Sequence, residues 1–165
     1  MKRSGTVVTV KTTLTVNAAF LQEIKEVNQD LWTLFRSLRD TPRRSLDLRG
    51  PARRFVEELE RLRDLLAMHF SLEEAFGYFE DPVSAAPRLS CRADALRAEH
   101  RELYVMLGEV IDLTEQLQVD GRYTAGMADE VFETFQAFSR RFEQHERAEN
   151  ELILEAFDDD IGVGD

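Results

Sequence analysis

The sequence predicts an all-α protein, an up-down-up-down antiparallel four-helix bundle preceded by an N-terminal extended arm. Three observations lead to this fold. Four long segments contain almost no glycine or proline, and their apolar residues recur in steps of three and four, as on a helix with one buried stripe. The breaks between the segments are short or moderate, so neighbouring helices are expected to pack antiparallel.

Residues that stop helices or begin turns separate the segments. They are Gly50-Pro51, the stretch from Asp81-Pro82 to Pro87, and Asp120-Gly121. We expect helices over residues 17–39, 51–80, 88–118 and 125–157, which together form one bundle domain of residues 17–157. Residues 5–16 alternate threonine and valine without a partner strand, so residues 1–16 are interpreted as an extended arm. Residues 158–165 are interpreted as an acidic tail.

Composition limits the possible partners. A chain of 165 residues with 43% apolar residues has the size and core of one globular domain. The net charge of -11 disfavours nucleic acid and anionic membrane surfaces, and no apolar run is long enough to span a bilayer. Cys91 is the single cysteine, and the N-terminus lacks the apolar core of a signal peptide. Both features favour a reducing cytoplasm.

All three histidines fall on the predicted core stripes. The stripe of the second helix is Phe55, Leu59, Leu62, Leu66, His69, Glu73 and Phe76; that of the third is Leu89, Ala93, Leu96, His100, Leu103, Leu107, Val110, Thr114 and Leu117; that of the fourth is Ala128, Val131, Phe135, Phe138, Phe142, His145, Glu149, Leu152 and Ala156. Counting from the helix ends, His69 and His100 both lie roughly 16 Å from their shared loop. His145 lies at the height of His100 to within roughly 3 Å.

The first helix contributes an asparagine to this layer. Its stripe is Asn17, Leu21, Ile24, Asn28, Leu31, Phe35 and Leu38. About eleven residues into the helix, at the depth of the three histidines, the stripe position is Asn28.

Two carboxylates accompany the histidines and indicate a metal site. Glu73 and Glu149 follow His69 and His145 by four residues, which places each carboxylate one helical turn from its imidazole on the same face. Glutamate is rarely buried unless it is paired, and the core stripes contain no lysine or arginine. A bound cation is therefore the remaining source of positive charge.

The donor types limit the choice of metal. Imidazole and carboxylate together suit iron, manganese or zinc better than calcium or magnesium. Five such ligands are too many for one tetrahedral zinc ion. Two metal ions bridged by Glu73 and Glu149 would use the five ligands better.

Other histidine sites fit the pattern less well. Ferritin-like proteins place a glutamate three residues before a histidine, but Leu66, Arg97 and Phe142 hold those positions. The segment "HERAE" begins like a zinc-protease motif but has Glu149 where that motif needs a second histidine. Phosphotransfer requires an exposed imidazole, whereas these three lie on core stripes.

The segments "HFSLE" (69–73), "EHREL" (99–103) and "HERAE" (145–149) resemble, in order and spacing, the hemerythrin-like HHE cation-binding domain, over about residues 17–157. The resemblance implies a four-helix bundle with a non-haem di-iron centre. Members bind dioxygen, sense oxygen or redox state, handle nitric oxide or peroxide, or take part in iron homeostasis. It also implies that His69, His100 and His145 are terminal iron ligands and that Glu73 and Glu149 are carboxylate bridges.

The chain departs from this family at Asn28, which stands where the family has a first-helix histidine. An amide oxygen is a weak, neutral ligand, so one iron would be loosely held, take water, or recruit another residue. Tyr104, one turn after His100, is the candidate substitute because a phenolate binds ferric iron well. The alternative for Tyr104 is a core aromatic with a hydrogen-bonded hydroxyl.

The residues do not separate an oxygen carrier, a sensor and an enzyme that reacts with peroxide or nitric oxide, since these roles use the same ligands. A degenerate family member stays open as the alternative function. Such a protein would be metal-free or mononuclear and would act as a structural or interaction bundle.

Overall fold

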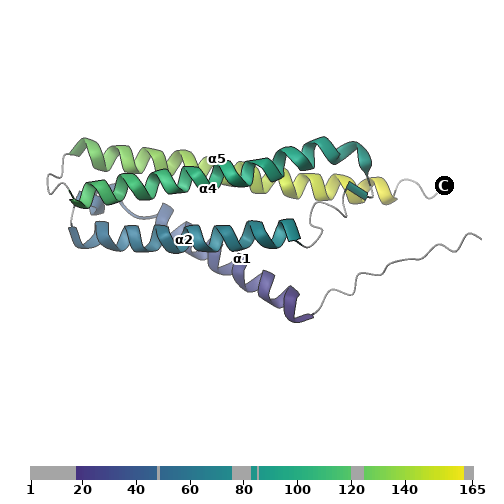
Figure 1. The fold of residues 1–165 in the computed structure, drawn as a ribbon, viewed down its shortest axis with the longest axis horizontal. Coiled ribbons are helices and arrows are strands. Elements are labelled where there is room, and N and C mark those ends of the chain that lie inside the picture. Colours follow the sequence, from purple (N-terminus) through teal and green to yellow (C-terminus); the bar gives the residue numbers. More distant parts are fainter. Residues whose placement is uncertain (1–17, 48, 76–82, 85, 120–124, 162–165) are drawn as a thin grey trace, which may run out of the picture.

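The computed structural model describes residues 18–47, 49–75, 83–84, 86–119 and 125–161. Within these ranges it is helical and contains no strand. The long helices are α1 (Ala18–Arg39), α2 (Arg49–Ala75), α4 (Ser90–Val119) and α5 (Ala125–Ile161), and two short 3-10 helices, η1 (Arg43–Asp47) and η2 (Pro87–Leu89), precede α2 and α4 (Figure 1). The predicted N-terminal arm lies outside the described residues.

The helix bounds match the predicted ones to within two residues at the start and end of α4, and they differ more informatively at the start of α2 and the end of α5. Helix α2 begins at Arg49 and takes Gly50 and Pro51 into its first turn, where a proline needs no hydrogen-bonding N–H and has a suitable φ. Helix α5 continues through the first part of the predicted acidic tail to Ile161. Aspartate is a weak helix former, but extending an existing helix fixes only one residue for each new backbone hydrogen bond.

The long helices pack in sequence order, α1 on α2, α2 on α4 and α4 on α5. Figure 1 shows α2, α4 and α5 along the long axis of the molecule, whereas α1 crosses them obliquely and its N-terminal end leans away from the other three. Aromatic contacts also join α1 to α5: Trp32 lies on Phe142 and Phe35 on Phe138. The later residue of α1, Phe35, contacts the earlier residue of α5, Phe138, so these two helices are antiparallel.

The predicted stripes form the core. Every residue of the second, third and fourth stripes for which the structure describes the side chain is buried. The main cluster contains an aromatic group, in which Phe35 packs against Phe135, Phe138 and Phe142 at ring-centroid distances of 5.3–6.5 Å.

A polar layer interrupts the hydrophobic core. On α4, His100 lies between Leu96 of a small apolar cluster and Leu103 of the main one. On α5, His145 and Glu149 are also flanked by residues of these two clusters. The histidines and glutamates therefore occupy a buried level with apolar packing on both sides. Among the described residues, no helix has the length and apolar character needed to cross a membrane.

Replacing Phe35 by alanine tests the aromatic core. Its side chain is fully buried among three phenylalanines of α5, so Phe35→Ala should lower the free energy of unfolding by about 3–5 kcal/mol. Urea unfolding of the metal-free protein measures this change. Val105→Ala, at a position 51% exposed, should change it by less than about 0.5 kcal/mol. Equal losses for the two variants would contradict this description of the core.

Candidate metal centre

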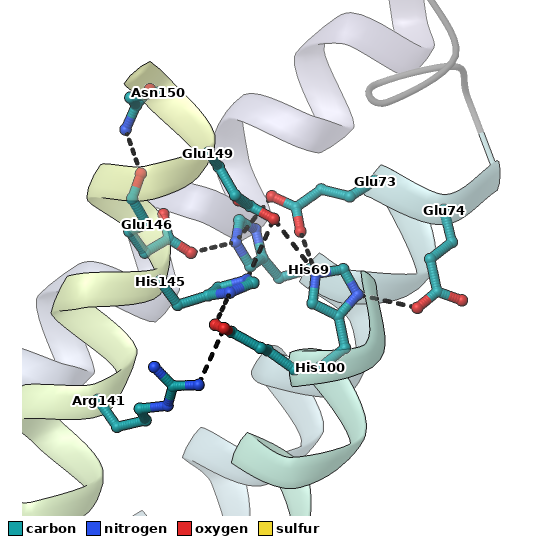
Figure 2. A network of polar contacts seen from close by, with 10 residues as sticks. His69, Glu73, Glu74, His100, Arg141, His145, Glu146, Glu149 and Asn150 are labelled. Carbon is teal, nitrogen blue, oxygen red and sulfur yellow. Dashed lines mark hydrogen bonds and ion pairs between the residues drawn. The ribbon is translucent and has the colours of Figure 1, made fainter. Parts of the chain in front are cut away.

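Three helices bring the five predicted donor side chains together (Figure 2). His69 and Glu73 lie on α2, His100 on α4, and His145 and Glu149 on α5. All five are buried, His145 and Glu149 to 1% exposure. In the pairs His69–Glu73 and His145–Glu149, the spacing of four residues places both side chains one helical turn apart on the buried face, as the sequence predicts.

Glu149 joins the histidines of α4 and α5. Its Oε1 atom lies 3.2 Å from Nε2 of His100 and 3.1 Å from Nε2 of His145. Its Oε2 atom has no hydrogen-bond partner among the described residues, and neither has Nε2 of His145, whose approach to Glu149 lacks hydrogen-bond geometry. Two imidazole nitrogens therefore converge on one carboxylate. One of these nitrogens and the second carboxylate oxygen remain available to bind a metal ion.

Glu73 occupies the corresponding place between α2 and α4. Its Oε1 atom lies 3.1 Å from Nε2 of His69, and its Oε2 atom lies 3.6 Å from Nε2 of His100. The latter distance is too long for a hydrogen bond, and Oε2 is buried without a partner in the described part of the chain. Both glutamates thus present a free oxygen inside the layer.

Carboxylates outside the layer fix two of the imidazoles. Nδ1 of His100 lies 2.8 Å from Glu74, and Nδ1 of His145 lies 3.1 Å from Glu99, which also receives Nη2 of Arg141 at 2.9 Å. A hydrogen bond donated by Nδ1 leaves the Nε2 lone pair free to bind a metal, and metal-binding histidines usually have such a partner. This arrangement orients both Nε2 atoms inward.

Sequence reasoning missed Glu146. This residue follows His145 directly, and its Oε1 atom lies 2.9 Å from Nε2 of His69. With it, the donor atoms form two groups, each within 4.8 Å: His100, His145 and Glu149 in one, and His69, Glu73 and Glu146 in the other. Glu146 lies off the core stripe, so the helical repeat gave no signal for it.

The two further predicted ligands lie differently. Asn28 is half-buried on α1, and its Oδ1 atom is buried with no hydrogen-bond partner among the described residues. Tyr104 is 42% exposed and makes no hydrogen bond with the donor residues in the described part of the protein. The buried face of α4 passes through His100, Leu103 and Leu107, which turns Tyr104 outward and gives the phenolate hypothesis no support.

The close carboxylates change one another's protonation. Burial, followed by the charges of Glu149 and Glu146, raises the pKa of Glu73 to about 10. Burial acts in the same direction on Glu149, but His100 and His145 outweigh it and lower the Glu149 pKa below the ordinary value. Burial disfavours protonated His145, yet the neighbouring Glu149 and Glu99 raise its pKa. Without a metal, the layer therefore takes up a proton at Glu73.

Comparison with known proteins agrees with this geometry. A sequence profile described as the hemerythrin HHE cation-binding domain matches residues 19–155, which is most of the chain. The chain belongs to the hemerythrin HHE cation-binding family. No curated protein and no solved structure matches it significantly. The family resemblance seen in the three histidine segments is thus confirmed, and the matched residues include parts of all four long helices.

Metal-free protein should lose stability as the pH rises. In the folded protein the pKa of Glu73 is about 10, whereas in the unfolded chain this carboxyl has its ordinary pKa of 4.5. Between these values the folded state binds more protons, so the free energy of unfolding falls with pH by up to about 1.4 kcal/mol per unit. Urea unfolding in chelator at several pH values measures this slope.

Glu73→Gln should remove that contribution and flatten the profile, because glutamine does not titrate. Glu57→Gln, an exposed substitution on the same helix, is the matched control and should keep the wild-type slope. Parallel profiles for wild type and Glu73→Gln would contradict the assignment of the buried proton to Glu73.

Proposed function

We propose that the protein binds iron at a non-haem di-iron centre inside an up-down-up-down bundle, through His69, Glu73, His100, His145 and Glu149. The centre would bind or react with dioxygen, peroxide or nitric oxide, or serve in iron and redox homeostasis. One observation carries the proposal. Three imidazoles and two carboxylates share a buried layer in which Glu73 Oε2, Glu149 Oε2 and His145 Nε2 lack hydrogen-bond partners among the described residues.

The charge of the layer supports a cation. Burying carboxylates is unfavourable unless positive charge or hydrogen bonds compensate them. Arg141 reaches the outer Glu99 and Glu102, and the buried charged or titratable residues among those described are the five donors alone. Metal ions between the two glutamates would supply the missing charge and use the three unpartnered atoms.

The donor set favours iron over the other common ions. Mixed nitrogen and oxygen donors suit first-row transition metals rather than calcium or magnesium. Structural zinc prefers four ligands, often with sulfur, whereas this layer offers more donors and no cysteine. Bound iron would supply redox chemistry and exchangeable coordination positions for a small ligand. The protein's own contribution is to hold Nε2 of His100 and His145 inward, through Glu74 and Glu99, and to exclude bulk water.

Family membership supports cation binding in general. Which of dioxygen, peroxide and nitric oxide reacts at the centre would depend on which of them can reach the buried layer. The proposal leaves Tyr104 outside the site because of its exposed position. Asn28 offers a neutral amide oxygen that is buried without a hydrogen-bond partner among the described residues, and as a ligand it would add no charge to a bound metal. The metal-free structural bundle is the competing function.

Elemental analysis tests the proposal. Protein purified from cells grown with iron should contain between one and two iron atoms per chain and little zinc, and should unfold at a higher temperature than chelator-treated protein, since metal binds the folded state. Glu149→Ala should lose most of this metal, because its carboxylate lies between two histidines.

Glu151→Ala is the matched control, since Glu151 lies on the same helix but on its exposed side, and it should keep the wild-type metal content. An absorption spectrum of the iron protein would add the charge-transfer bands expected of a ferric site. Absence of transition metal in the wild-type protein, even after anaerobic reconstitution with iron, would favour the metal-free bundle instead.

A further inference from the structure

The five donors predicted from the sequence divide unequally, because His100, His145 and Glu149 lie together and only His69 and Glu73 remain for the other end of the layer. We infer that Glu146 is the third ligand at that end, so that one metal ion is bound by His69, Glu73 and Glu146 and the other by His100, His145 and Glu149. This inference rests on the proposed metal binding and adds a ligand that the family pattern does not contain.

Geometry is the first support. Nε2 of His69 lies 2.9 Å from Glu146 Oε1 and 3.1 Å from Glu73 Oε1. In Figure 2 the carboxylate of Glu146, on α5, points toward the ring of His69, on α2. Three donor atoms from two helices thus gather within 4.8 Å, a spacing from which small side-chain movements would close around one ion.

Burial is the second support. Glu73 is more than nine-tenths buried, and its Oε2 atom has no hydrogen-bond partner in the described part of the protein. The Glu146 side chain is 13% exposed although it sits on the flank of α5. A glutamate that reaches inward to a histidine, beside another buried glutamate, is expected to have a positive partner.

The surroundings of Glu146 give the third support. A cleft of about 410 Å³ is lined by Trp32, Glu143, Glu146, Arg147 and Asn150. Trp32 lies on α1 one turn after Asn28, so α1 and α5 border the cleft together. Glu146 therefore contacts an interior donor, His69, and also lines a cleft at the surface. A buried metal site requires an entry path, and an ion that entered through this cleft would meet Glu146 first.

A ligand role for Glu146 would compensate for Asn28, which stands where the family has a first-helix histidine. A neutral amide replaces a neutral imidazole on α1, and an ionised carboxylate on α5 supplies the missing donor. The ion at the His69 end would then have two carboxylates and one imidazole, while the other ion would have two imidazoles and one carboxylate. Because carboxylate is the harder ligand, the two sites should differ in affinity and in spectrum.

Cobalt(II) titration of the metal-free protein tests this inference, with the cobalt absorption bands and bound metal per chain as readouts. Wild type should bind two equivalents. Glu146→Gln, which keeps the side-chain shape, should bind one equivalent with wild-type affinity and the other about tenfold or more weakly. Glu143→Gln is the matched control from the same helix and cleft, and should bind both equivalents normally.

A double variant locates the affected ion. If His69 and Glu146 hold the same metal, His69→Ala combined with Glu146→Gln should lose no more than the one equivalent that His69→Ala loses alone. His145→Ala combined with Glu146→Gln should lose both. Two equivalents bound to Glu146→Gln with wild-type affinity would overturn the inference but not the proposed function, whereas wild-type protein that binds no metal would overturn the proposed function itself.

Discussion

The carboxylate of Glu149 is the contact on which the candidate site depends. One of its oxygens lies within 3.2 Å of Nε2 atoms from two different helices, and the whole residue is 1% exposed. Such a group is stable only if its partners stay in place. The apolar clusters on either side of the layer hold α4 and α5 in that register, so core packing and the polar layer each require the other.

Negative charge exceeds positive charge around this contact. Five glutamates contact the three histidines, and Arg141 joins the network through Glu99 at the edge. Without metal, the excess is relieved by retaining a proton on Glu73, whose pKa lies near 10. A metal ion bound in this layer, as proposed, would displace that proton, and the same excess of negative charge would then favour binding. The strain of the metal-free layer and its affinity for cations therefore have one electrostatic origin.

The helical repeat made most of the site predictable. Apolar spacing placed His69, His100 and His145 on buried faces, and the helix ends placed them at one level, because rise per residue is nearly constant. The repeat could not assign Glu146, which is one position from the stripe and whose side chain reaches from α5 to His69 on α2. Tyr104, one turn after the buried His100, lies at the margin of the buried face and is 42% exposed, so its role as a ligand stays a prediction.

The position of α1 explains why the donor residues of the two groups come from the other three long helices. All six donor residues of the two groups come from α2, α4 and α5, which lie along one axis, whereas the N-terminal end of α1 leans away from them (Figure 1). Helix α1 is fixed instead by aromatic packing, with Trp32 and Phe35 against Phe142. If Glu146 on α5 takes the ligand role that the family gives to a first-helix histidine, metal binding would not depend on a ligand from α1. Helix α1 would instead contribute Trp32, which lines the cleft beside Glu146.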